Sequence, residues 1–135
     1  MQIAIDPKNG VPIYEQLVRQ VKFAVAEGVV QPGQAIPSVR EMARSLTVNP
    51  NTVQRAYLQL QNEDVLESLR GRGMVVATGA LDRCKTDRQQ IVTQRLQKAL
   101  AEAVSSGIEE ATLRKLLEEA LQGALAVQAS EQNDS

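Results

Sequence analysis

The most constraining feature of this sequence is a series of start and stop signals between Pro37 and Ala77. Ser38, followed three residues later by Glu41, is a capping box, in which each side chain can satisfy a free amide at a helix N-terminus. Apolar residues then recur at helical spacing, which predicts a short amphipathic helix with arginines on its solvent side. The apolar positions are Val39, Met42, Ala43 and Leu46, and the arginines are Arg40 and Arg44.

A second helix is expected directly after a short turn. Asn49 is a favoured N-cap residue, and Pro50 suits the first helical position, where its missing N–H is not needed. Helical spacing turns one side inward (Val53, Ala56, Tyr57 and Leu60) and the other outward (Asn51, Gln54 and Arg55). Amide and guanidinium side chains can read adenine or guanine edges in a DNA major groove, and a helix N-terminus attracts anions.

A hairpin is predicted to follow, because two short extended runs flank the sequence Arg-Gly-Arg-Gly. The strands are expected at 67–69 and 74–77, and Gly71 and Gly73 permit the positive φ of a tight loop. Arg70 and Arg72 would then stand on a thin tip that can reach DNA phosphate or a narrow minor groove. Two helices and a hairpin in this order predict a winged helix-turn-helix. The expected fold class is mostly α with a small β-wing, an α+β fold.

The segment from Ile13 to Val76 resembles the N-terminal domain of GntR-type bacterial transcription regulators, and its motifs VNPNTVQRAY and RGRG resemble the YtrA subgroup in particular. The resemblance implies DNA contacts from the first helix of the pair, the second helix and the wing. The implied positions are Arg40, then Asn49, Asn51, Thr52, Gln54 and Arg55, then Arg70, Gly71 and Arg72. Many members of the family carry arginine or threonine where this chain has Pro50 and Asn51, so their base preferences do not transfer.

Net charge does not by itself indicate a nucleic-acid-binding protein. The 135 residues carry 15 basic and 16 acidic side chains, with a net charge of −1 and a pI of about 5.5, whereas many such proteins are strongly basic. Affinity depends on where positive charge gathers, and we expect the arginines of both helices and the wing to share one face. Aromatic residues make up only 2%, which predicts an aliphatic core built mainly from helices.

The rest of the chain is expected to support this domain and to form a dimer. A support helix is predicted at 13–27, ended by Gly28, and residues 34–36 are expected to pair with the wing as a short strand. The DNA-binding domain would then span residues 1–78. Residues 79–86 show no apolar periodicity and are interpreted as a linker. Two amphipathic helices are expected within 87–128, followed by a polar, flexible tail at 129–135.

Two such helices cannot bury both of their apolar stripes without a third layer. We therefore expect a homodimer through the C-terminal helices, which would form a four-helix arrangement and present two recognition helices to a pseudo-palindromic operator. The resemblance agrees, because YtrA-like regulators dimerise through two helices and lack larger effector-binding domains. The sequence identifies no small-molecule effector.

The leading hypothesis is a sequence-specific DNA-binding regulator, a repressor that occupies its operator. The alternative is a winged-helix protein-interaction module without specific DNA binding. An enzyme is not expected, because the chain has no histidine, one thiol without an evident base, and no glycine-rich phosphate loop after a strand. Metals and other cofactors are not expected for want of Cys and His ligands. The lone Cys84, the lack of a signal pattern and the lack of a long apolar run predict a cytoplasmic protein without membrane contact.

Overall fold

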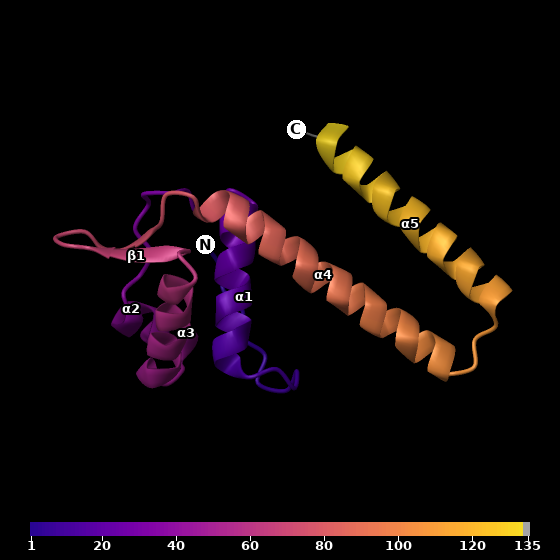
Figure 1. The fold of residues 1–135 in the computed structure, drawn as a ribbon, viewed down its shortest axis with the longest axis horizontal. Helices are drawn as coiled ribbons and strands as arrows, with labels where there is room; N and C mark the ends of the chain where they lie inside the picture. The colour runs from indigo at the N-terminus through magenta and orange to yellow at the C-terminus, as the bar shows by residue number, and fades with distance from the viewer. Residues whose placement is uncertain (134–135) are drawn as a thin grey trace. The chain divides into compact units, whose positions relative to one another are not determined.

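A computed structural model describes residues 1–133 of the chain, which divides into two compact units, Met1–Val92 and the residues from Thr93 onward. The fold class is the expected one, mostly α with a two-stranded antiparallel wing (Figure 1). The elements are α1 (Ile13–Ala26), α2 (Val39–Leu46), α3 (Pro50–Asn62), β1 (Leu66–Leu69), β2 (Gly73–Val76), α4 (Ala80–Ser105) and α5 (Glu110–Asn133).

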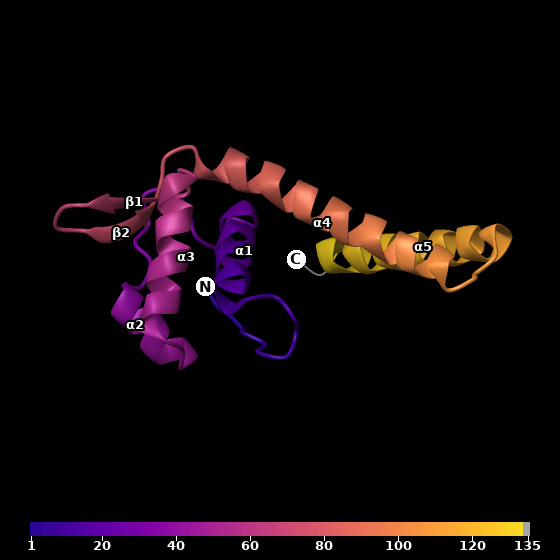
Figure 2. The same ribbon diagram turned by 60° about the horizontal axis from the view of Figure 1, so that its bottom comes forward.

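The core of the first unit lies around α3, which contacts both α1 and α2 and is followed by β1 (Figure 2). The side of α3 predicted to face inward is buried, at Val53, Ala56, Tyr57 and Leu60. The Tyr57 hydroxyl donates a 2.7 Å hydrogen bond to the Pro37 carbonyl, which ties α3 to the segment before α2. Burial, and secondarily the negative charge of Glu41, raises the pKa of Tyr57, so this hydroxyl keeps its proton and remains a donor.

Both predicted helix starts are confirmed by cap hydrogen bonds. The Ser38 hydroxyl oxygen accepts from the Glu41 amide at 3.1 Å, and the Asn49 side-chain oxygen accepts from the Asn51 amide at 2.8 Å. Between the two helices the chain turns through Thr47, which has a φ of 55° in the left-handed region. These local contacts set the angle at which α3 leaves α2.

The wing forms where it is expected, although β1 begins one residue earlier than predicted and β2 is shifted by one residue toward the N-terminus. Leu69 pairs with Gly73, so residues 70–72 form the loop, and Gly71 and Gly73 have φ values of 80° and 75°. A third segment joins the hairpin, since the Ile36 amide donates to the Met74 carbonyl at 2.9 Å, as predicted for residues 34–36. The loop extends beyond the helices of this unit (Figures 1 and 2).

The prediction of a non-helical linker at 79–86 is wrong, because α4 already begins at Ala80. Ala80 and Cys84 lie one turn apart and are fully buried, so this turn of helix is held by the core of the first unit. Two small residues make a weak periodic signal, which explains why the pattern was missed. The expected flexible tail is also helical through Asn133, and residues 129–133 contain no glycine or proline that would end the helix. Positions 134 and 135 lie outside the described residues.

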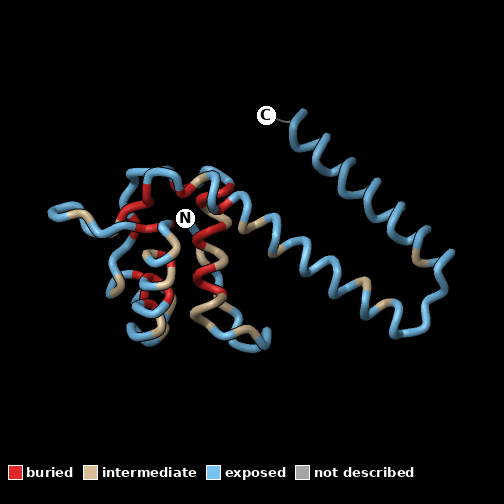
Figure 3. The backbone as a smooth tube through the Cα atoms, viewed as in Figure 1, coloured by how far each residue is buried: buried red, intermediate tan, exposed pale blue. Residues whose placement is uncertain are grey.

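The second unit has little core of its own. No residue of α5 is buried, whereas buried positions concentrate in the first unit (Figure 3). Several large apolar side chains of α4, α5 and the turn between them are exposed, at Val92 of the first unit and at Leu96, Val104, Ile108, Leu116, Leu117, Leu121, Leu125 and Val127. Within residues 1–133, none of the helices combines the length and apolar character that crossing a membrane requires.

Candidate nucleic-acid interface

The N-terminal half of α3 exposes the side chains expected to face outward. Asn51, Gln54 and Arg55 are exposed, whereas Thr52 is half-buried. The side-chain oxygen of Asn49 is already engaged by the helix cap, which leaves its NH₂ group as the donor for another partner. The exposed face of this half therefore offers amide and guanidinium groups beside the positive end of the helix dipole.

The same face contains two residues whose role the sequence did not indicate. Tyr14 of α1 and the exposed Leu58 of α3 line a shallow groove together with the predicted residues Asn51, Gln54 and Arg55. The Arg55 guanidinium lies over the Tyr14 ring, 3.7 Å from its centroid. The only sequence signal for Tyr14 was an aromatic residue in a chain that has few of them. Its partner on another helix could not be found from spacing along one helix.

The arginines of α2 stand on its solvent side, as the amphipathic pattern predicted. Arg40 and Arg44 are exposed, while Met42 and Ala43 are buried between them. Because α2 packs directly against α3, these positive side chains belong to the same compact unit as the exposed face of α3. Guanidinium groups at this place suit phosphate contacts that fix orientation.

The wing tip is exposed at Arg70, Gly71 and Arg72. Arg72 folds back, and its Nη2 donates a 2.9 Å hydrogen bond to the Gly33 carbonyl. This contact ties the wing loop to the segment after α1, while the remaining N–H groups of the guanidinium stay available. The sequence placed Arg72 on the tip but gave no sign of this tether, since Gly33 is distant in the chain.

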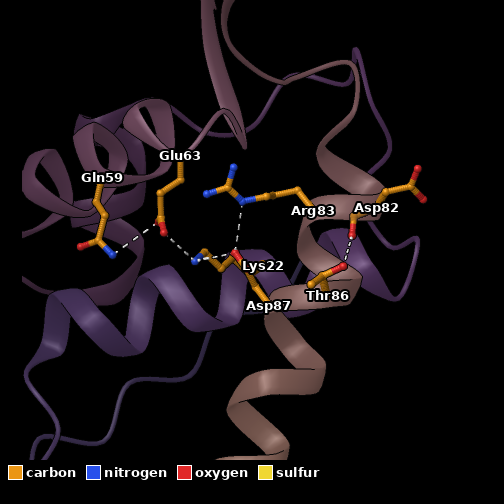
Figure 4. Close-up of polar contacts among 7 residues, drawn as sticks. All are labelled: Lys22, Gln59, Glu63, Asp82, Arg83, Thr86 and Asp87. Atoms are coloured by element: carbon orange, nitrogen blue, oxygen red, sulfur yellow. Dashed lines mark hydrogen bonds and ion pairs between the residues drawn. The ribbon is translucent and has the colours of Figure 1, made fainter.

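Behind the interface, a buried cation joins three helical segments (Figure 4). Lys22 of α1 has a side chain only 8% exposed, and its Nζ lies 3.1 Å from both a Glu63 oxygen at the end of α3 and an Asp87 oxygen on α4. Arg83 approaches the same Asp87 carboxylate at 3.7 Å, and Gln59 donates to Glu63 at 3.5 Å. The cluster therefore fixes the C-terminal end of the recognition helix α3 against α1 and the start of α4.

The lone thiol is a core group. Cys84 is fully buried, and burial raises its pKa to about 11, an effect that the nearby Lys22 ammonium partly opposes. The thiol is therefore protonated near neutral pH and is a poor nucleophile. In the described part of the chain, no group of three or more His, Cys, Asp or Glu side chains is arranged to hold a metal ion.

Comparison with known proteins agrees with this geometry. The family model described as bacterial regulatory proteins, gntR family, matches residues 13–76. The HTH-type transcriptional repressor YtrA of Bacillus subtilis (strain 168) is 36% identical over 117 residues, covering 87% of this chain and 90% of that protein. Among solved structures, a transcriptional regulator from Oenococcus oeni superposes with a TM-score of 0.69 at 31% identity, covering 87% of this chain and 98% of the other. YtrA from Sulfolobus acidocaldarius, a GntR-family transcription factor, gives a TM-score of 0.55 at 27% identity, covering 90% and 97%.

The similarity extends beyond the winged helix. The matched family range coincides with the segment whose motifs resemble this family, and the longer similarity to YtrA includes most of the C-terminal helices. In helix-turn-helix proteins the second helix lies in the DNA major groove and the first helix crosses the backbone. The chain therefore belongs to the GntR family of bacterial regulatory proteins, within its YtrA subgroup, and is a DNA-binding transcriptional regulator.

Proposed function

We propose that this regulator is a repressor that binds a pseudo-palindromic operator as a homodimer. The observation that carries the proposal is the capped N-terminal half of α3, which exposes Asn51, Gln54 and Arg55 on a helix whose opposite side is fully buried. Exposed amides and a guanidinium on a rigid helix suit the donor and acceptor pattern of the major groove. The repressor role is supported by the name of the similar Bacillus subtilis protein.

The nine candidate residues divide into two roles. We assign base reading to the exposed side chains of α3, and positioning on phosphate to the arginines of α2 and the wing. The base-reading group is Asn49, Asn51, Thr52, Gln54 and Arg55, and the positioning group is Arg40, Arg70 and Arg72, with Gly71 shaping the loop. Thr52 has the smallest exposed surface of the first group, so its contribution should be the smallest.

Dimerisation is assigned to the C-terminal helices, which follow the DNA-binding domain of residues 1–78. Support comes from α5, where Leu116, Leu117, Leu121 and Leu125 are all more than a third exposed. A soluble monomer rarely leaves so large an apolar surface to water. A second copy packed on these residues would bury the stripe in a four-helix arrangement, and would separate the two half-sites by roughly one DNA turn, about 34–36 Å.

This proposal includes no catalytic role, since the relatives carry names of regulators. It places the protein in the cytoplasm, where bacterial chromosomal DNA is found. A protein-interaction module without specific DNA binding is not favoured by the family to which the chain belongs.

The proposal can be tested by selecting duplexes from a random-sequence pool with the full-length protein. The expected result is an enriched sequence with approximate two-fold symmetry, bound by two protomers per duplex. Leu121→Lys should convert a dimer into a monomer in sedimentation velocity and should weaken binding to the enriched duplex, because a charge would enter an apolar interface. Glu131→Lys, an exposed charge change on the same helix, is the matched control. Selection without enrichment, or a Leu121→Lys dimer, would contradict the proposal.

A further inference from the structure

Arg55 differs from the other arginines of the interface in having an aromatic ring beneath it. Its guanidinium carbon lies 3.7 Å from the centroid of the Tyr14 ring. Tyr14 stands in the first turn of α1, is half-buried and packs against the core, so the ring is carried by a fixed helix. Its hydroxyl donates a 3.3 Å hydrogen bond to a Glu15 oxygen, away from the stacking face. A residue of the support helix therefore reaches the exposed face of α3.

Stacking of this kind occupies only the flat face of a guanidinium. The ring quadrupole attracts the cation, while the N–H groups around its edge remain free to donate. Among residues 1–133, no protein group accepts a hydrogen bond from Arg55 or pairs with its charge. An unsupported arginine loses much of its rotamer freedom when it binds, whereas a stacked one has lost part of it beforehand.

The other residues that line the groove are neutral, and they include Asn51, Gln54 and Leu58. The oriented guanidinium fork is thus the positive donor among amides on the exposed face of α3. Two parallel N–H groups match the O6 and N7 acceptors of guanine, which is the most frequent specific contact in major grooves. A phosphate could also accept from this fork, but it would carry no sequence information.

We propose that Tyr14 is a positioning residue that sets DNA specificity, by holding the Arg55 guanidinium flat so that its edge binds a guanine of the operator. The inference rests on the proposed operator binding and adds to it a residue outside the helix-turn-helix. The face of Tyr14 supplies the support, so the ring matters and the hydroxyl does not. Arg55 requires a planar fork, which lysine lacks.

The test uses the duplex enriched from a random pool by the wild-type full-length protein, and a random duplex of equal length. Tyr14→Leu should weaken binding to the enriched duplex by about three- to thirtyfold and leave the random duplex unaffected. Tyr14→Phe should bind both duplexes as the wild type does. Arg55→Lys should lose at least as much as Tyr14→Leu on the enriched duplex alone. Adding Tyr14→Leu to Arg55→Ala should cause no further loss.

Other results would overturn the inference in distinct ways. Equal losses on both duplexes, with a salt slope reduced by about one, would mean that Arg55 binds phosphate. A loss in Tyr14→Phe as large as in Tyr14→Leu would mean that the hydroxyl acts. Should Tyr14→Leu fail to fold by circular dichroism, specificity retained in Arg55→Lys would still refute the proposal. A pool without enrichment would refute operator binding itself, whereas an enriched duplex bound normally by Tyr14→Leu would refute this inference alone.

Discussion

Lys22→Met should destabilise the protein far more than the loss of an ordinary surface charge. The Lys22 side chain is 8% exposed and lies 3.1 Å from carboxylate oxygens of both Glu63 and Asp87, whose side chains are 28% and 19% exposed. Methionine keeps most of the volume but leaves two half-buried carboxylates without their shared cation. Breaking a buried ion pair costs about 3–5 kcal/mol, and the partial exposure of the carboxylates lowers our expectation to about 2–3 kcal/mol.

Urea unfolding at one fixed protein concentration measures this loss, since the proposed dimerisation would make stability depend on concentration. With a slope of about 1–3 kcal/mol per molar urea, the midpoint should fall by about 0.7–3 M. The matched control is Arg114→Met, because Arg114 pairs with Glu110 at 3.1 Å while both side chains are more than three-quarters exposed; its effect should stay below about 0.5 kcal/mol. Equal, small losses in both variants would refute the reasoning.

A rescue experiment separates charge from packing. Adding Glu63→Gln and Asp87→Asn to Lys22→Met removes both carboxylate charges that Lys22 neutralised. The triple variant should regain most of the lost stability, less the contribution of the 3.7 Å contact between Arg83 and Asp87, as replacement of buried ion clusters often does. If the triple variant were no more stable than Lys22→Met, the loss would have to come from packing of the lysine chain rather than from its charge.

Two further predictions concern buried and strained groups. Burial holds the native pKa of Cys84 at about 11, above its value in the unfolded chain, so its contribution to stability is complete below about pH 8.5 and declines as the pH rises toward 11. Between pH 8 and pH 9.5, the free energy of unfolding measured in urea should fall less in Cys84→Ala than in the wild type. Identical declines in the two proteins would contradict the burial argument. Gly71→Ala should strain the wing loop, where φ is 80°, by about 1–2 kcal/mol and should weaken DNA binding. Its control is Gly123→Ala within α5, which should slightly stabilise the protein. An unchanged DNA affinity in Gly71→Ala would argue against a role for the wing.

Local signals explain what could be predicted from the sequence. The caps at Ser38 and Asn49, the inward side of α3 and the glycines of the wing depend on residues a few positions apart, and these features form as expected. The start of α4 was missed because burial of Ala80 and Cys84 depends on the core assembled by other elements. Helical propensity through residue 133 similarly outweighed the polar composition of the expected tail.

The finer structure of the interface depends on partners that are distant in sequence. Arg55 meets a ring on α1, and Arg72 hydrogen-bonds to the Gly33 carbonyl, 39 residues away. Lys22 likewise joins α1 to Glu63, 41 residues away. Periodic patterns in the sequence do not predict such pairs, because each pair joins two elements whose relative orientation is set only by the folded core. The sequence could therefore indicate which side of α3 is exposed but not how the side chains on that side are held.

The most direct test of the central claim is the salt dependence of DNA affinity for the wild type, Arg40→Ala and Arg114→Ala on the selected duplex. If the face built by α2, α3 and the wing binds DNA, Arg40→Ala should weaken binding and reduce the slope of log affinity against log salt by about 0.9, the value for one phosphate contact. Arg114→Ala, which removes a charge from α5, should leave that slope unchanged. Equal slopes in all three proteins would show that DNA does not bind at Arg40 of α2.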